Sequence, residues 1–231
     1  MDAIDLTDLD FLDRLRRQDE RAFSLLFRET RDRIYNTVLR MVRCPTEAQD
    51  ITQDVFLRAY RGLARFRGDS SITSWLYRIA LNQVRNRAKY HSRRHYRAHD
   101  PLDEERHGAT RPIPAAMDRP DRRLAAARLE HFLVRALQAL DPDFREVVVL
   151  RDIEGLSYAE VQQVTGLEMG TVKSRLHRGR TWLAERLAER DRGEPSPLIS
   201  ESQPTGQPTG QPTGKNSRPL VLAALVSGQV R

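Results

Sequence analysis

A run of basic and hydroxyl side chains between Met169 and Arg180 is the stretch of this sequence best equipped to bind a ligand. It contains four lysines or arginines and no acidic residue. A helix here would present the polar side chains of Thr171, Lys173, Ser174, Arg175, His177, Arg178 and Arg180. Arginine reads guanine edges, while lysine, serine and threonine hold phosphates. The pattern favours a helix that reads the major groove of duplex DNA, with a solvated basic helix as the alternative.

A second basic cluster is interleaved with aromatic residues. No acidic residue occurs between Arg85 and Arg97. The cations of this cluster are Arg85, Arg87, Lys89, Arg93, Arg94 and Arg97. Tyr90 and Tyr96 lie among them, and Trp75 lies upstream. Because unstacked bases lie on aromatic rings while cations pair with the backbone, the cluster predicts a surface for single-stranded or melted nucleic acid. The ring of Trp75 itself is expected in the core.

A face of opposite character precedes this cluster. Its members, at spacing i, i+1, i+4 and i+5 on one side of a predicted helix, are Gln49, Asp50, Gln53 and Asp54. Acidic and amide groups would repel DNA, and they suit a protein-docking surface. Asp50 and Asp54 could also hold a metal ion in a nuclease. No further ligand lies nearby in the sequence, so an enzyme is the weaker interpretation.

Composition sets the class of partner and the compartment. The net charge is +7 and the isoelectric point is about 10.0, which favours a polyanionic partner such as nucleic acid. The single cysteine, Cys44, excludes an internal disulfide and a multi-cysteine zinc site, and it favours the reducing cytoplasm. The longest apolar run, Leu220 to Val226, is too short to cross a membrane. We therefore expect no metal, no cofactor and no membrane insertion.

The elements that must position these groups are all predicted to be helical. The fold class is all-α, with helical domains over 8–95 and 122–190 and a flexible linker over 96–121, which holds four prolines. The tail over 191–231 repeats Gln-Pro-Thr-Gly three times between Gln203 and Gly214, so we expect it to be disordered. Its closing segment, Leu220 to Val230, is apolar enough to dock on the body or on a partner.

Four helices are predicted in the first domain. Apolar residues at helical spacing mark the first two, namely Leu9, Leu12, Leu15, Phe23, Leu26, Phe27, Ile34, Val38, Met41 and Val42. Pro45 ends the second helix, and Thr46 is expected to start the third with Gln49 in a capping box. The buried face of the third helix is predicted to be Ala48, Ile51, Val55, Ala59 and Leu63. A loop at Gly68–Ser71 precedes the fourth helix, whose apolar members are Trp75, Leu76, Ile79 and Val84.

In the second domain, an apolar stripe predicts a first helix through Leu129, Phe132, Leu133, Ala136, Leu137 and Leu140. Asp141 is expected to cap the next helix, with Pro142 at its first position. Gly155 is expected to end that helix.

The outline of a helix-turn-helix follows, over about residues 158–177. Ser157 and Glu160 predict a capping box at the start of a short helix, Gly166 supplies the left-handed turn, and another helix begins near Met169. The residues expected to pack these two helices together are Val161, Leu167, Val172 and Leu176.

Three stretches together resemble the extracytoplasmic-function sigma factors. The first is DITQDVFLRAY at 50–60, similar to the family's helix that binds core RNA polymerase. The second is FRGDS at 66–70 with SWLYRIA at 74–80, on to Asn82, similar to the segment that captures and melts the minus-ten element. The third is LSYAEV at 156–161 with GTVKSRLHRGR at 170–180, similar to the helix-turn-helix that reads the minus-thirty-five element. The resemblance covers about residues 10–190.

The resemblance implies three sets of site residues. The beta-prime clamp of core polymerase would meet a face formed by Gln49, Asp50, Gln53, Asp54 and Phe56. The minus-ten DNA would meet Gly68, Asp69, Ser70, Ser71, Trp75, Arg78, Asn82 and Arg85. Within that set the loop over 68–71 would hold a flipped base, and Arg85 would grip the non-template strand. The upstream duplex would meet Tyr158, Gly170, Thr171, Lys173, Ser174, Arg175, His177 and Arg178.

The function implied by the resemblance is that of a sigma factor, which binds RNA polymerase core, directs promoter-specific initiation and is not itself an enzyme. An anti-sigma factor, commonly membrane-linked, is an implied partner. A stand-alone helix-turn-helix regulator is the alternative, but it leaves the acidic face and the Trp75 segment unexplained. Gln162 departs from the family, which usually has a small alanine there, so its side chain must turn outward or widen the packing. The repeat tail lies outside the family pattern.

Overall fold

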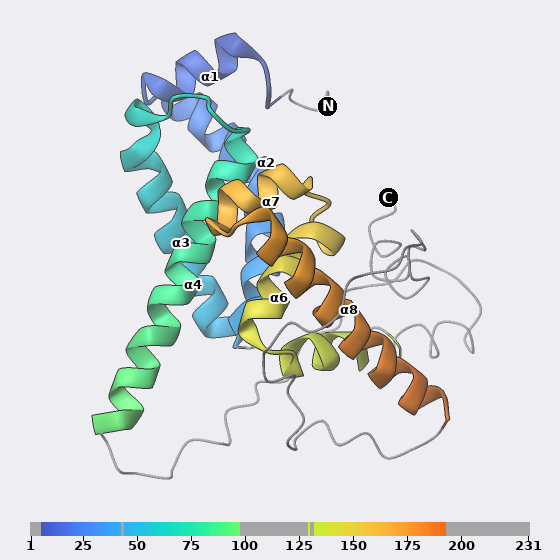
Figure 1. Cartoon of the computed structure of the whole chain (residues 1–231). Helices are drawn as coiled ribbons and strands as arrows, with labels where there is room; N and C mark the ends of the chain where they lie inside the picture. Colours follow the sequence, from blue (N-terminus) through green and yellow to red (C-terminus); the bar gives the residue numbers. More distant parts are fainter. Residues whose placement is uncertain (1–5, 43, 98–128, 130–131, 193–231) are drawn as a thin grey trace, which may run out of the picture. The chain divides into compact units, whose positions relative to one another are not determined.

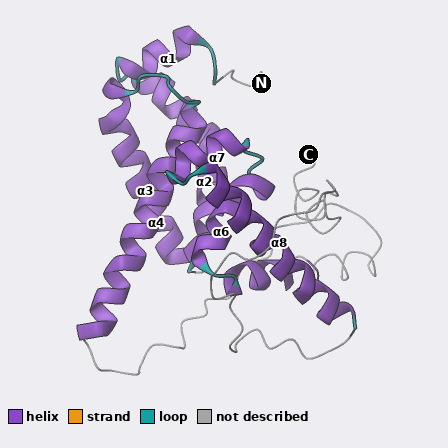
Figure 2. Ribbon diagram, in the orientation of Figure 1, coloured by secondary structure: helices purple, strands orange, loops and turns teal. Residues whose placement is uncertain are grey.

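The computed structural model of the chain describes residues 6–42, 44–97, 129 and 132–192. Every regular element in these ranges is a helix (Figures 1 and 2), which confirms the all-α class. Most of the predicted linker and tail, including the Gln-Pro-Thr-Gly repeats and the apolar closing segment, lie outside the described residues.

The N-terminal part of the chain forms α1 (Leu9–Arg16), α2 (Glu20–Val42), α3 (Pro45–Gly62), the short 3₁₀ helix η1 (Leu63–Arg65) and α4 (Ile72–Arg97). Aspartates cap the first two helices. Asp8 accepts a hydrogen bond from the backbone N–H of Asp10, and Asp19 accepts one from Ala22 at 2.7 Å. The Ala22 hydrogen bond, with a smaller contribution from Arg14, lowers the pKa of Asp19, whereas desolvation opposes that shift.

The start of α3 differs from the predicted capping box. Cys44 is the N-cap residue, Pro45 occupies the first turn, and no side chain caps this end of the helix. Proline lacks the backbone N–H that a cap would satisfy, and its fixed φ angle suits the first helical position. Thr46 therefore already lies inside the helix, and the predicted pairing of Thr46 with Gln49 is wrong.

The core of this part lies among α2, α3 and α4, which pack on one another. The face of α3 predicted to be buried is confirmed, because Ala48, Ile51, Val55, Ala59 and Leu63 are all at most 1% exposed. On α2, Leu26, Ile34 and Val38 are fully buried. Phe27 was expected on the same apolar stripe, but it is 36% exposed because it lies at the edge of the stripe.

The C-terminal part begins with a helix over 132–139 and continues with α6 (Pro142–Val148), the π-helical turn η2 (Val149–Ile153), α7 (Tyr158–Thr165) and α8 (Met169–Asp191). Asp141 caps α6 through the N–H of Asp143 at 2.8 Å, with Pro142 in the first turn, as predicted. The π turn before Gly155 was not expected, since the sequence had indicated one uninterrupted helix.

The predicted helix-turn-helix outline is confirmed in its local backbone. Ser157 and Glu160 form the reciprocal capping box of α7. Gly166 has a φ of +73° and ends α7 in the left-handed conformation, after which α8 begins at Met169. Val161, Val172 and Leu176 are buried, and Leu167 is half-buried. That these residues pack the two helices together stays a prediction.

Contacts among residues group the chain into two compact units. One contains α1 to α4 and α7. The other contains the 132–139 helix, α6, η2 and α8.

Candidate nucleic-acid interface and protein-docking face

The loop between η1 and α4 is built by three local devices. Phe66 ends η1 through a hydrogen bond from its N–H to the carbonyl of Leu63. Gly68 turns the chain with a φ of +84°, a conformation that favours glycine. Ser71 caps α4, because its Oγ accepts a hydrogen bond from the N–H of Ser74 at 3.1 Å. The hydroxyl of Ser71 is therefore engaged in capping α4, and Ser71 does not line the cavity that the preceding loop residues form.

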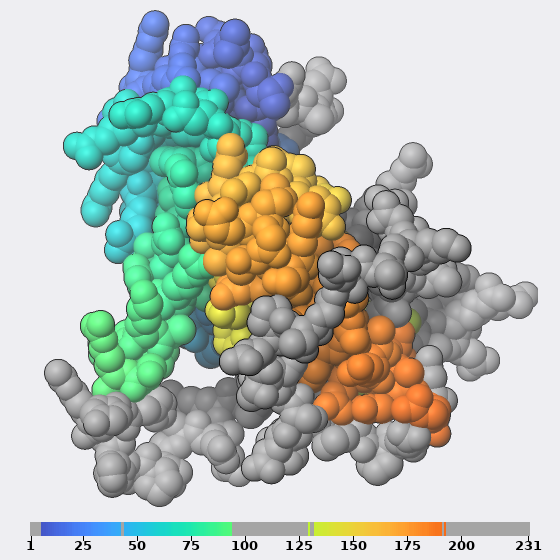
Figure 3. All heavy atoms as spheres, in the orientation of Figure 1, coloured from blue at the N-terminus to red at the C-terminus, as the bar shows by residue number. Residues whose placement is uncertain are grey.

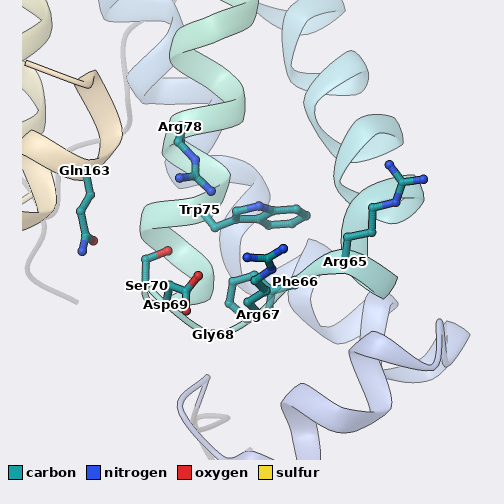
Figure 4. A pocket seen from close by; sticks show the side chains of 9 residues that line it. All are labelled: Arg65, Phe66, Arg67, Gly68, Asp69, Ser70, Trp75, Arg78 and Gln163. Atoms are coloured by element: carbon teal, nitrogen blue, oxygen red, sulfur yellow. The ribbon is translucent and has the colours of Figure 1, made fainter.

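A cavity of about 440 Å³ lies on this loop (Figure 4). This volume lies in the range of small-molecule binding pockets. Its lining combines aromatic rings, cations and short polar groups, from Arg65, Phe66, Arg67, Gly68, Asp69, Ser70, Trp75, Arg78 and Gln163. Figure 4 shows the Trp75 ring among the side chains of Phe66, Arg67 and Arg78. The cavity therefore offers a flat apolar surface beside positive charge.

Trp75 has two roles in this cavity. Its ring packs at 5.4 Å between centroids against Phe66, which is 6% exposed. It also contacts the backbone at Gly62, where a Cβ atom would lie only 3.1 Å from the indole. Trp75 is half-buried, so one part of its ring belongs to the core as expected and another part faces the cavity.

The other predicted minus-ten residues lie further along α4. Arg78 lines the cavity, whereas Asn82 is exposed and is absent from the lining. Arg85 is half-buried and donates a hydrogen bond to the carbonyl of Thr165 in α7 at 3.1 Å. In the same unit, the hydroxyl of Ser74 donates to the carboxylate of Glu160 at 3.0 Å.

The basic cluster along α4 divides into anchored and exposed members. Arg87 and His91 both reach Glu47 of α3, at 3.6 and 2.9 Å. Tyr90 is 56% exposed, and Lys89 and Arg93 beside it are exposed. The side chains of residues 94–97, which include Tyr96, lie outside the described residues. The part of the cluster that faces solvent keeps the ring and cations expected of a base-stacking surface.

The acidic and amide face of α3 is exposed as predicted, since Gln49, Asp50, Gln53 and Asp54 all face solvent. Phe56 is 4% exposed, and its ring packs edge-on against Phe27 at 4.8 Å, so it supports the face from below. Leu57, which was not among the residues predicted for this face, is 56% exposed. Its position, three and four residues after Asp54 and Gln53, was the available signal, because helical spacing places it on the same face.

The exposed face of α8 carries part of the predicted reading set. Gly170, Lys173, Ser174 and His177 are exposed, while Thr171 and Arg178 are half-buried. The hydroxyl of Ser174 donates to the carbonyl of Thr171 at 3.1 Å. Tyr158, at the start of α7, is half-buried.

Two arginines of the basic run are held by carboxylates instead. Arg175, 23% exposed, pairs with Asp143 at 2.6 Å and with Glu146 at 3.5 Å. Arg180 pairs with Asp152 through two of its nitrogens. These ion pairs attach α8 to α6 and η2, and sequence reasoning had no means of finding them, because they join residues 28 to 32 positions apart.

Among the described residues, no group of three or more side chains could hold a metal ion. No helix in those ranges has the length and apolar character needed to span a membrane.

Comparison with protein families gives two matches in chain order. Residues 26–94 match Sigma-70 region 2, and residues 133–183 match Sigma-70, region 4. The RNA polymerase sigma-H factor of Pseudomonas aeruginosa is 36% identical over 177 residues, which cover 75% of this chain and 90% of that protein. The ECF RNA polymerase sigma-E factor of Escherichia coli is 33% identical over 179 residues, which cover 76% and 91%.

Solved structures show the same architecture. CnrH, solved in complex with the cytosolic domain of CnrY, is 26% identical with a TM-score of 0.56, over 81% of this chain and 99% of that one. The sigma factor RpoE of Bartonella quintana, solved with the anti-sigma factor NepR, shares the fold at 23% identity and a TM-score of 0.60, over 72% and 96%. The chain belongs to the extracytoplasmic-function subfamily of the sigma-70 family of sigma factors.

Proposed function

We propose that this chain binds RNA polymerase core and directs it to promoters by contacting DNA at two places. The observation that carries the proposal is the cavity beside Trp75, in which an aromatic ring, cations and a glycine turn meet. A base that leaves the DNA stack needs a ring or an apolar wall to lie on and polar groups to recognise its edge.

The minus-ten site of the proposal is this cavity with the neighbouring face of α4. Gly68, Asp69 and Ser70 line the place for a flipped base, with Trp75 and Arg78 beside it. Ser71 acts by capping α4. Asn82 and Arg85 lie further along α4, where they would meet the non-template strand.

The minus-thirty-five site of the proposal is the exposed face of α8. Lys173, Ser174 and His177 would reach into the major groove, with Gly170, Thr171 and Arg178 at the borders of the contact. Tyr158 is proposed to meet the same duplex on the family resemblance alone. Arg175 would act partly through its ion pairs, which set the direction of α8.

The protein-docking face on α3 is proposed to meet the beta-prime clamp of core polymerase. Gln49, Asp50, Gln53 and Asp54 supply its polar rim, and Leu57 adds an apolar contact at its end. Phe56 shapes this face from the core.

The mechanism requires no catalytic residue in this chain, because polymerase performs the chemistry. The domain limits proposed for the two modules are 8–95 and 122–190. When polymerase fixes the distance between them, the second DNA contact becomes intramolecular, and avidity rises without new contacts. The cytoplasm, where polymerase and promoters meet, is the proposed compartment.

An anti-sigma factor is proposed as a further partner. The similar protein CnrH was solved with the cytosolic domain of CnrY bound. A partner of that kind would control this chain by covering the surfaces that core polymerase or DNA must reach.

Run-off transcription with purified core polymerase and genomic promoter fragments, followed by mapping of the RNA 5′ ends, tests the proposal. We expect discrete start sites that depend on the added chain. A footprint made by the chain without polymerase, combined with no initiated RNA, would instead identify a stand-alone regulator.

A further inference from the structure

Arg16, the last residue of α1, is bonded to the loop that forms the cavity. Its Nε donates to the carbonyl of Phe66 at 3.0 Å, and its Nη2 donates to the carbonyl of Arg67 at 3.3 Å. Phe66 and Arg67 both line the cavity. One side chain therefore fixes two consecutive backbone carbonyls immediately before the glycine turn.

Two further groups, the carboxylate of Asp13 and the ring of Phe66, orient the guanidinium of Arg16. Its Nη1 pairs with the carboxylate of Asp13, one turn earlier in α1, at 2.6 Å. Its central carbon lies 6.0 Å from the centroid of the Phe66 ring. The guanidinium is a rigid planar fork whose donor directions are fixed and whose plane can lie on a ring, whereas a lysine ammonium is a point charge with rotatable donors.

Close packing at Gly68 shows how directly Arg16 meets the turn. A Cβ atom built on Gly68 would lie 3.1 Å from Nη2 of Arg16. The turn and the guanidinium therefore occupy adjoining space, and the placement of residues 68–70 depends on where Arg16 holds the preceding carbonyls. In Figures 1 and 3, α1 lies directly against the segment that follows α3.

We propose that Arg16 is a positioning residue for the capture of a minus-ten base, and that α1 is part of the promoter-melting apparatus. The match to Sigma-70 region 2 begins at residue 26, so it does not reach Arg16. The inference rests on the proposed function of the cavity. Arg16 touches no DNA in this role and acts through the shape of the loop.

The test compares Arg16→Lys with Arg14→Lys in the full-length chain assembled with core polymerase. The control makes the same substitution in the same helix, at a residue whose only described contact is with Asp19, at 3.4 Å. The probes are fluorescent single-stranded oligonucleotides with the non-template minus-ten sequence of a promoter mapped by run-off transcription. One probe is intact, and in the others one base at a time is removed to leave an abasic site.

We expect wild type and Arg14→Lys to bind the intact probe about fivefold to a hundredfold more tightly than the probe that lacks the captured base, as stacking of one base allows. Arg16→Lys should lose most of this preference while its affinities for core polymerase and for an upstream duplex stay unchanged. If Arg16→Lys impairs assembly with core, Asp13→Asn serves as a second variant, because it removes the carboxylate charge that orients the Arg16 fork and leaves Arg16 in place.

The outcomes distinguish the role of Arg16 from the role of the cavity. Equal base preference in wild type and in the Arg16→Lys or Asp13→Asn holoenzyme would overturn the role of Arg16 and leave the cavity's role intact. No base preference in wild type at any position would overturn the proposed function of the cavity, and the inference with it.

Discussion

Arg175 and Lys173 lie two residues apart in α8, and their surroundings differ. Lys173 is exposed, whereas Arg175 is paired with two carboxylates of α6. A lysine at the surface can neutralise a phosphate at little cost to the fold. An arginine that holds a neighbouring helix would affect DNA binding partly through the orientation of its own helix. Residue type and position in the basic run do not tell a phosphate-binding cation from a structural one. The carboxylates that contact each side chain in the folded protein do.

Lys173→Ala should weaken upstream promoter binding about equally for all sequences and reduce the slope of log affinity against log salt by about 1. The unfolding midpoint of Lys173→Ala should not change.

Arg175→Ala should also weaken upstream promoter binding, and it should in addition lower the free energy of unfolding by about 1 kcal/mol. The side chain of Glu146, which is 8% exposed, loses one of its partners in this variant. Urea unfolding and holoenzyme binding at several salt concentrations measure both effects. An unchanged unfolding free energy for Arg175→Ala would contradict the structural part of its role.

Leu57 makes a residue-level prediction about the docking face on α3. Leu57→Ser should weaken binding to core polymerase about tenfold, since burial of an exposed leucine is worth about 1.5 kcal/mol or more. Asp54→Ala should also weaken this binding while the fold stays intact. The matched control is Leu9→Ser, which changes a leucine of α1 that is 75% exposed. Competition against a labelled sigma factor for core measures the affinities, and an equal effect of the Leu9 change would refute the assignment.

At the scale of the elements, α8 approaches α6 closely at Gly179. A Cβ atom there would lie 2.8 Å from Val148 and 3.4 Å from the Cβ of Phe144. Gly170, at the other end of the same helix, has open space around it. The buried Arg145 holds the end of the 132–139 helix by donating to the carbonyls of Leu137 and Gln138. Close backbone approach and buried hydrogen bonds therefore set the platform from which α8 projects.

Gly179→Ala and Gly170→Ala form a matched pair that tests this packing. Gly179→Ala should lower the free energy of unfolding by about 1–3 kcal/mol, because α6 and α8 must separate to admit the methyl group. Gly170→Ala should leave stability unchanged or raise it slightly, since alanine favours helix and nothing crowds the site. Thermal unfolding of both variants measures the two effects. Equal stability of Gly179→Ala and Gly170→Ala would show that α6 and α8 accommodate the methyl group without loss of stability.

Acid unfolding tests the cap of α2. The pKa of Asp19 is lowered in the folded chain from an ordinary value of 3.8, mainly by the hydrogen bond from Ala22. The ionised cap therefore contributes stability that is fully present above that value and is lost as pH falls through the folded pKa. Asp19→Asn keeps a hydrogen-bond acceptor but carries no charge. The difference in unfolding free energy between wild type and this variant should therefore shrink as pH falls below 3.8. Unfolding midpoints measured against pH would show the trend, and a constant gap would contradict it.

At the scale of the whole molecule, the proposed function divides recognition between two helical modules. The net charge of the whole chain, +7, favours DNA without selecting a sequence. In the proposed function, selection depends on simultaneous contact at two sites, which polymerase would make possible by setting their separation.

The free chain should consequently bind a full promoter about a hundredfold to ten-thousandfold more weakly than the holoenzyme does, since only the bound polymerase makes the second contact intramolecular. Gel-shift titration of one promoter fragment, with and without core, measures the ratio. Core alone is the control. Equal affinities for the free chain and the holoenzyme would support the stand-alone regulator instead.

Local signals in the sequence determined much of this protein. The all-α class, the caps at Asp141 and Ser157, the turn at Gly166 and the buried face of α3 all follow from short-range rules, because helical spacing and capping involve residues within a few positions of one another. The start of α3 was misjudged because two local rules competed there, and the proline rule prevailed over the capping box.

Contacts between residues far apart in the chain were decided by the tertiary structure alone. The bond from Arg16 to the loop spans 50 residues, and the ion pair of Arg175 with Asp143 spans 32. Sequence patterns report which side chains share a face, but the distance between two faces is fixed only when the helices pack, and that packing forms the cavity beside Trp75.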